Sequence, residues 1–224
     1  MDQDGMANMD AERILPQNGR TCNLVILLHG YGADATDLLP FAETLAKALP
    51  ATAFVAPNAP DFLPYEALGG RQWFPLSDRD LREYRTGAEA AAQALTHFVD
   101  QELQQFSLRP EALAIFGFSQ GAMMALQVGL RGKLAPAALA AFSGLLPGID
   151  NLSDIHTGTP VLIVHGEDDD VVDPSHLIGA RTALESIGVE CEAHLLKELD
   201  HCIDSRGIEL AADFLKRAFG MSEG

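Results

Sequence analysis

The segment Gly117-Phe118-Ser119-Gln120-Gly121 constrains the fold of this chain more than any other, because of the residues on either side of it. Residues 111–116 form a short apolar run typical of a buried strand, and residues 122–130 have the composition of a helix. A G-x-S-x-G sequence between a strand and a helix forms a sharp turn, with the serine in a strained conformation at the helix N-terminus. We therefore expect Ser119 Oγ to stand clear of the edge of a sheet.

Apolar runs alternate with helical patterns along the rest of the chain. The runs that predict strands are residues 23–29, 52–56, 112–117, 137–142 and 160–165, with an alternating last strand at 190–197 and a candidate leading edge strand at 14–16. The helical patterns cover residues 38–49, 83–106, 120–130, 176–187 and 206–219. Strands that alternate with helices predict an α/β fold, in which a mostly parallel sheet has helices on both faces.

The chain of 224 residues is expected to form one domain, because no repeat, low-complexity tract or linker divides it. Residues 1–12 are a candidate flexible start. With 47% hydrophobic and 21% charged residues, the composition is that of a globular protein. The longest segment without clear periodicity is 57–81, and its aromatic residues argue against disorder.

The charge and the cysteines exclude several classes of protein. A net charge of −17 argues against binding to nucleic acid and against stable association with anionic membranes. The cysteines (Cys22, Cys191 and Cys202) are odd in number and form no C-x-x-C pair, which fits a reducing cytosol. The sequence also has no visible signal peptide, and no apolar run approaches the ~20 residues of a membrane span.

A nucleophilic serine needs a base, and the base needs an orienting carboxylate. In a strand–turn–helix context of this kind the acid and the histidine follow the serine in that order, at the ends of later strands. The predicted strand ending at 165 leads into the acidic residues 167–170, and the one ending at 197 leads to His201. Ser119, an acid near position 169, and His201 therefore satisfy the order.

The other histidines compete poorly for this role. His29 and His165 each precede a glycine at a strand end, which indicates a structural role in a turn. Ordinary surface positions are expected for the remainder, which are His97, His156, His176 and His194. Residues 167–170 have neither zinc-type partners nor the alternate-residue spacing of a calcium loop, so we expect no metal and no cofactor.

The negative charge that develops during attack on a carbonyl group needs hydrogen-bond donors. One expected donor is the backbone N–H of Gln120, directly after the serine. The second should come from the loop after the first long strand, residues 29–32, where the N–H of Tyr31 is the candidate by position.

At this point the chain resembles the phospholipase/carboxylesterase family of α/β-hydrolases. The segments that match the family are residues 28–34 (LHGYGAD), 56–60 (APNAP), 69–74 (GGRQWF), 117–121, 142–144 (FSG), 165–172 (HGEDDDVV) and His201. The resemblance implies an α/β-hydrolase fold without a large lid domain and a Ser-His-Asp carboxylester hydrolase. It selects Asp169 as the acid, because the family acid is the fifth residue of an H-G-x-x-D-x-x-V stretch. The chain departs from the family at Asp173, where proline is common, and at Cys202, where serine is common.

The resemblance also suggests small to medium acyl esters as substrates, and the same residues could act on thioesters. The candidates to line an acyl groove are Phe62, Leu63, Trp73, Phe74, Leu145, Val171 and Val172. Alternatives are an acyl-protein thioesterase or lysophospholipase with the same triad and, from another class, a non-catalytic binding module. Homodimers are common in the family.

Overall fold

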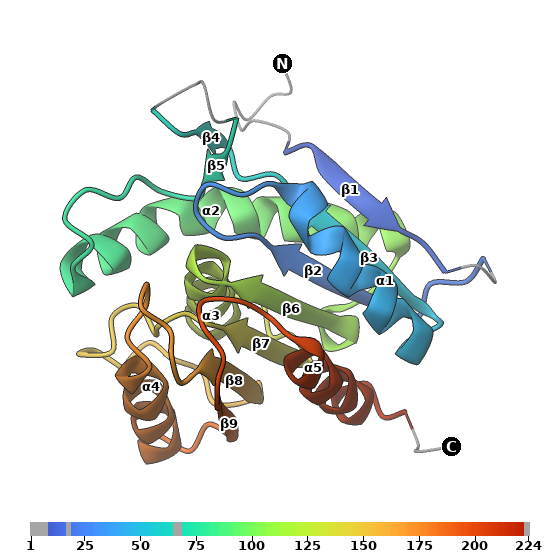
Figure 1. The fold of residues 1–224 in the computed structure, drawn as a ribbon. Helices are drawn as coiled ribbons and strands as arrows, with labels where there is room; N and C mark the ends of the chain where they lie inside the picture. The colour runs from blue at the N-terminus through green and yellow to red at the C-terminus, as the bar shows by residue number, and fades with distance from the viewer. Residues whose placement is uncertain (1–8, 17–18, 65–68, 222–224) are drawn as a thin grey trace.

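A seven-stranded sheet forms the middle of the molecule (Figure 1). The computed structural model describes residues 9–16, 19–64 and 69–221. In spatial order the strands are β1 (Ala11–Ile14), β3 (Thr52–Pro57), β2 (Asn23–Leu28), β6 (Leu113–Phe118), β7 (Ala138–Phe142), β8 (Val161–Gly166) and β9 (Cys191–Leu196). Only β1 runs antiparallel to its neighbour, and the other six strands are parallel. The mostly parallel α/β sheet predicted from the sequence is therefore confirmed.

Helices cover both faces of this sheet (Figure 1). The helices are α1 (Leu39–Ala48), α2 (Leu81–Phe106), α3 (Gln120–Arg131), α4 (Ser175–Ser186) and α5 (Ser205–Ala218), with short 3-10 turns η1 (Ala35–Leu38) and η3 (Pro110–Ala112). Helices α1 and α5 share one hydrophobic cluster with the sheet, and α2, α3 and α4 share the cluster on the other face. Each face of the sheet is thus covered, as in other doubly wound α/β folds.

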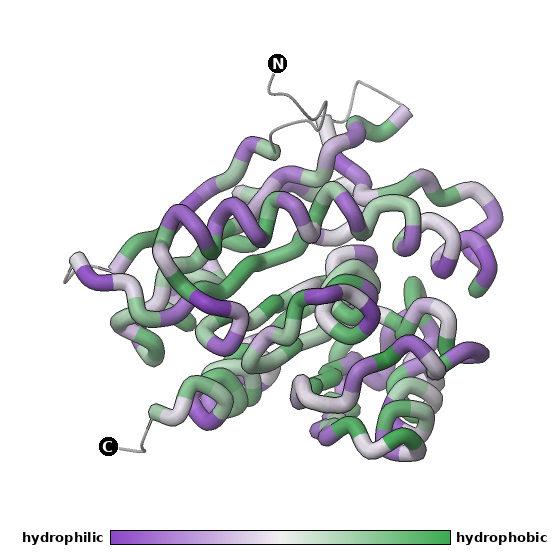
Figure 2. Tube along the Cα trace, turned by 180° about the vertical axis from the view of Figure 1, so that it is seen from behind, coloured by the Kyte–Doolittle hydropathy of each residue, from purple (hydrophilic) through white to green (hydrophobic). Residues whose placement is uncertain are grey.

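The central strands are buried on both faces, which explains their continuous apolar sequences. Along β2, Val25 and Leu27 belong to the cluster with α1 and α5, while Ile26 and Leu28 belong to the cluster with α2 and α3. All four side chains have no exposed surface. Figure 2 shows the consequence, with hydrophobic residues along the interior strands and alternating polar and apolar residues along α2.

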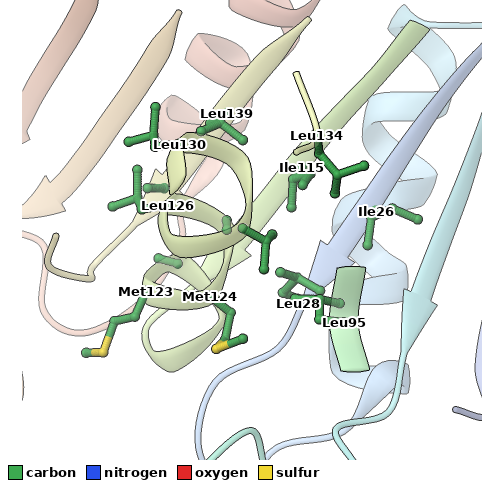
Figure 3. Close-up of a cluster of buried hydrophobic side chains, with 14 of the residues drawn as sticks. Ile26, Leu28, Leu95, Ile115, Met123, Met124, Leu126, Leu130, Leu134 and Leu139 are labelled. Carbon is green, nitrogen blue, oxygen red and sulfur yellow. The ribbon is translucent and has the colours of Figure 1, made fainter. Parts of the chain in front are cut away.

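Helix α3 is the most buried helix, because it lies between the sheet and α2. Every residue from Gln120 to Leu130 is buried. Figure 3 shows Met124 of α3 beside Leu28 of β2 and Leu95 of α2, all three in the same cluster. A helix packed on two sides cannot shift easily, so the residue at its N-terminus is held firmly in place.

Two parts of the fold differ from the sequence-based expectation. The segment 57–81 contains a small hairpin, β4 (Asp61–Phe62) paired with β5 (Arg71–Gln72), that has too few residues to show a strand period. Residues 9–12 belong to the fold rather than to a flexible start, because Met9 is buried and β1 begins at Ala11. The expectation for residues 1–8 lies outside the described residues.

We predict that Gly121→Ala destabilises the protein. A Cβ atom at Gly121 would lie 2.0 Å from the carbonyl oxygen of Leu28, so α3 would have to move off β2. Overpacking of this kind costs about 1–3 kcal/mol, which denaturant unfolding would measure.

The matched control is Gly179→Ala in the middle of α4. Its Cβ would meet only Ile149 Cδ1, at an ordinary 3.5 Å, so the change should stabilise the helix by up to about 1 kcal/mol. Equal stability of the two variants would show that the contact between Gly121 and Leu28 is not tight.

Candidate active site

Ser119 occupies the turn between β6 and α3 in a strained backbone conformation. Its φ is 54° and its ψ is −117°, values that residues with a side chain rarely adopt. The strain, of the order of 1–3 kcal/mol, is held by neighbouring structure: Ser119 N–H donates to Phe142 O of β7 at 2.8 Å, and α3 is packed on two sides. The turn presents Oγ at the carboxyl edge of the sheet.

The structure brings Ser119, His201 and Asp169 together, as the sequence predicts. His201 Nε2 lies 3.0 Å from Ser119 Oγ, and His201 Nδ1 lies 2.8 Å from Asp169 Oδ2. The three residues follow β6, β9 and β8, whose carboxyl ends meet at the same edge of the parallel sheet. The side chains therefore form one continuous chain of hydrogen bonds from a hydroxyl to a carboxylate.

Asp169 differs from its acidic neighbours in its burial. Its side chain has no exposed surface, whereas Glu167, Asp168 and Asp170 are exposed. Burial alone would raise the pKa of Asp169, but hydrogen bonds from the Val172 N–H, from His201 and from the Val171 N–H outweigh it and lower the pKa below its usual 3.8. The carboxylate is thus ionised at neutral pH.

An aromatic ring and a thiol lie next to His201. The Phe118 ring lies 4.9 Å from the imidazole, centroid to centroid. The next residue, Cys202, is a thiol whose pKa is raised to about 11 by partial desolvation and by the neighbouring Asp200 carboxylate. Because a thiol must ionise to attack, Cys202 is a poor nucleophile at neutral pH.

The loop after β2 passes directly beside the serine. A Cβ atom at Gly30 would lie 3.2 Å from the Phe118 ring and 3.3 Å from Ser119 Cβ, so a side chain there would press against the serine. Strand β5 holds the loop, since Gly32 N–H donates to Arg71 O at 2.8 Å and Arg71 N–H donates to Ala33 O at 2.9 Å. The Tyr31 N–H makes no hydrogen bond to any other described residue and is free to serve a ligand.

The second expected donor, the Gln120 N–H, is the first amide of α3. An amide at this position has no acceptor within its own helix. The positive end of the helix dipole lies at the same place and favours a negative charge there.

A polar network that the sequence analysis missed joins this loop to the helix. The Gln120 side chain accepts from Trp73 N–H at 2.9 Å and donates to Phe74 O at 2.8 Å, and Trp73 Nε1–H donates to His29 O at 2.9 Å. His29 Nε2 in turn accepts from Ala59 N–H at 3.0 Å. The structural role expected for His29 is therefore to support the loop through these hydrogen bonds. Burial lowers the pKa of His29 and keeps its ring neutral.

The candidates for an acyl groove fall into two sets. Four are buried: Trp73 and Phe74 are 2% exposed, Leu145 is 3% exposed and Val172 is 7% exposed. The other three are accessible, with Phe62 at 59%, Val171 at 54% and Leu63 half-buried. Trp73 and Phe74 thus pack in the core between the sheet and α2, and they also line a separate cavity of about 260 Å³ beside Pro60.

A cavity of about 320 Å³ lies between the start of α2 and the loop after β7. Its lining is mostly apolar, with arginines at one side, and consists of Leu81, Arg82, Arg85, Leu145, Leu146, Gly148, Ile149 and Asp150. Leu145 follows Gly144, where a Cβ atom would lie 3.0 Å from Ser119 O. One end of the cavity lining is therefore next in sequence to a residue that packs against the backbone of Ser119.

The two departures from the family pattern leave the hydrogen-bonded chain intact. Asp173 accepts a hydrogen bond from Ser175 N–H at 2.8 Å and so stabilises the first turn of α4.

Within the described residues no group of three His, Cys, Asp or Glu side chains is arranged to hold a metal ion. None of the helices in that part of the chain has both the length and the apolar character needed to cross a bilayer.

Comparison with known proteins places this arrangement in a family. The model of the phospholipase/carboxylesterase family matches residues 9–219. The Escherichia coli esterase YpfH is 26% identical over 193 residues, which cover 86% of this chain and 82% of that protein. Acyl-protein thioesterase 1 of Saccharomyces cerevisiae is 32% identical over 162 residues, which cover 66% of this chain and 70% of that protein.

The comparison of structures agrees. The crystal structure of esterase PE8 superposes with a TM-score of 0.89 at 35% identity, over 95% of this chain and 100% of that one. The range of the family model, residues 9–219, includes the whole sheet, the turn at Ser119 and the loops that follow β8 and β9. The chain therefore belongs to the phospholipase/carboxylesterase family of α/β-hydrolases, and it is a carboxylic ester hydrolase.

Proposed function

We propose that this protein hydrolyses esters of small to medium acyl groups through an acyl-serine intermediate on Ser119, with His201 as the base and Asp169 as its orienting acid. The observation that supports this most directly is the unbroken hydrogen-bond chain, at 3.0 Å between Ser119 Oγ and His201 Nε2 and 2.8 Å between His201 Nδ1 and Asp169 Oδ2. Both distances are short enough for proton transfer without rearrangement.

In the first half of the reaction Ser119 Oγ attacks the ester carbonyl carbon while His201 Nε2 takes the hydroxyl proton. A tetrahedral intermediate forms, and its negative oxygen is bound by the N–H groups of Tyr31 and Gln120. His201 then returns the proton to the leaving alcohol oxygen as the bond from carbon to that oxygen breaks. Asp169 stays ionised throughout and stabilises the imidazolium.

In the second half a water molecule takes the place of the alcohol. His201 removes a proton from the water as its oxygen attacks the acyl-serine carbonyl, and the same two N–H groups bind the second oxyanion. Collapse of that intermediate returns the proton to Ser119 Oγ and releases the carboxylic acid. A single oxyanion donor typically contributes a factor of about 10²–10³ to turnover. The hydrogen bonds that hold residues 29–33 therefore contribute to the rate, because they fix the position of Tyr31.

For the acyl chain we propose the cavity beside Leu145. Its size, about 320 Å³, is at the small end of ligand pockets and suits a short or medium chain. The leaving group would then face the accessible side chains Phe62, Leu63 and Val171.

Thioester hydrolysis is the second candidate, favoured by the relationship to a yeast protein named acyl-protein thioesterase 1. A reducing cytosolic setting fits the free cysteines.

Replacement of the proposed nucleophile should abolish ester turnover. Ser119→Ala removes the attacking oxygen, and kcat for an activated acetate ester should fall by several orders of magnitude while circular dichroism is unchanged. The control is Ser107→Ala, the same change at an exposed serine with a similar φ of 53°, which should leave kcat as it is. Near-normal turnover by a folded Ser119→Ala protein would refute the proposal.

Activity should fall on the acid side through a single protonation. Because the pKa of Asp169 is lowered from 3.8, that carboxylate stays ionised at every pH above about 4 and cannot cause a loss of rate near neutrality. The group that takes up the proton is then the imidazole of the base. We expect log kcat/KM to decline with unit slope on the acid side, and His201→Ala to be inactive at all pH values. An active His201→Ala variant would assign the base to another residue.

The four consecutive acids provide a matched test of the third residue. Asp169→Asn keeps the shape but loses the charge that holds the imidazole, and kcat should fall by up to about 10⁴. Asp168→Asn and Asp170→Asn alter exposed side chains and should retain most of the activity. All three variants would be assayed on one activated ester. A large loss at position 168 or 170, with little at 169, would move the acid to that residue.

A further inference from the structure

A second histidine, His165, contacts the carboxylate of Asp169. It lies near the end of β8, the strand that leads to this aspartate, and its side chain has no exposed surface. Its Nε2 lies 2.9 Å from Val172 O and 3.1 Å from Asp169 Oδ2. The side chain therefore contacts both ends of the turn that carries Asp169.

The contacts of His165 determine where its proton is. Both oxygens near Nε2 are acceptors, so Nε2 must carry a hydrogen, which it donates to Val172 O. Nδ1 is buried and has no hydrogen-bond partner among the described residues. A second proton on Nδ1 would be a buried donor with nothing to bind, and burial accordingly lowers the pKa of His165, against the opposing effects of Val172 O and Asp169. His165 is thus a neutral, fixed donor.

The carboxylate of Asp169 accepts three hydrogen bonds from the described residues and lies close to His165. Oδ1 accepts from the N–H groups of Val171 and Val172, both at 2.9 Å. Oδ2 accepts from His201 at 2.8 Å and lies 3.1 Å from His165 Nε2. The oxygen that holds the proposed base therefore also lies within 3.1 Å of a second imidazole, from β8.

We propose that His165 is a positioning residue for the reaction: its Nε2–H, bonded to Val172 O, holds the turn that carries Asp169 and, at 3.1 Å from Oδ2, withdraws part of the negative charge that this oxygen presents to the base. The inference rests on the proposed function, in which His201 is the base. Without the His165 donor, Oδ2 would attract the protonated form of His201 more strongly and would also be freer to turn away. The base would remain protonated to a higher pH, and its alignment with Ser119 would suffer.

Other charged groups near this pair are the same in every variant of the test. At the start of α4 they are Asp173 and His176, which act on His165 through space. In the loop after β9 they are Asp200 and Asp204, on either side of the protonated Cys202. From β6 the neighbours are the uncharged Phe118 and Ser119. A difference between two substitutions at position 165 therefore reports the His165 hydrogen bond.

Two substitutions separate the hydrogen bond from the packing. His165→Gln keeps an amide N–H close to the position of Nε2, and His165→Leu fills a similar volume without a donor. We expect His165→Leu to lower kcat roughly tenfold and to move the acid limb of kcat/KM upward by roughly half a pH unit. His165→Gln should keep the wild-type acid limb and most of the rate.

A purely structural role would lower the thermal stability of both variants and leave both acid limbs where they are, and that result would overturn the proposal. The wild-type protein offers an independent test by nitrogen-15 NMR, which should find His165 as the neutral Nε2–H form; an Nδ1–H form would also overturn it. The parallel control is His201→Ala. If His201→Ala is active, the proposed function itself fails. If His201→Ala is inactive and a folded His165→Leu variant has an unshifted acid limb, only the role of His165 is refuted.

Discussion

The contact between the first turn of α3 and the end of β2 fixes the geometry on which the rest of the site depends. Gly121 meets the Leu28 carbonyl so closely that no Cβ atom fits between them. This contact sets the position of α3, and with it Ser119 and the N–H of Gln120. Since the same β2 strand continues into residues 29–33, one packing contact fixes the nucleophile, one oxyanion donor and the loop that supplies the other.

The polar groups of the site are supported by buried hydrogen bonds rather than by ion pairs. Asp169 is a buried carboxylate in a chain of net charge −17, and two N–H donors from its own turn, together with His201, compensate it, with His165 Nε2 3.1 Å away. On the opposite side, Gln120 and Trp73 connect α3 to the loop at Tyr31. Such networks are costly when incomplete and rigid when complete, which suits a site that must bind charge without reorganising.

The sequence predicted the sheet, its helices and the meeting of Ser119, Asp169 and His201, because these follow from local patterns. Continuous apolar runs mark strands that are buried on both faces, and the order of parallel strands places their ends together. It predicted less about segment 57–81. The bonds of Gln120 to Trp73 and Phe74 join residues 47 and 46 positions apart, and no local period reveals such pairs. For the same reason the sequence did not reveal the hydrogen bonds of Trp73 or the contact between His165 and Asp169.

The most direct test of this account is to find where a covalent inhibitor attaches. A fluorophosphonate reacts with a serine only when that serine is activated by its base and faces an oxyanion site, so it reports the whole arrangement at once. Mass spectrometry of the digested adduct should find one phosphonyl group per chain, on Ser119, and pre-incubation with a slowly hydrolysed ester should delay the labelling. A fully active protein that takes up no label, or one labelled at another residue with loss of activity, would contradict the account.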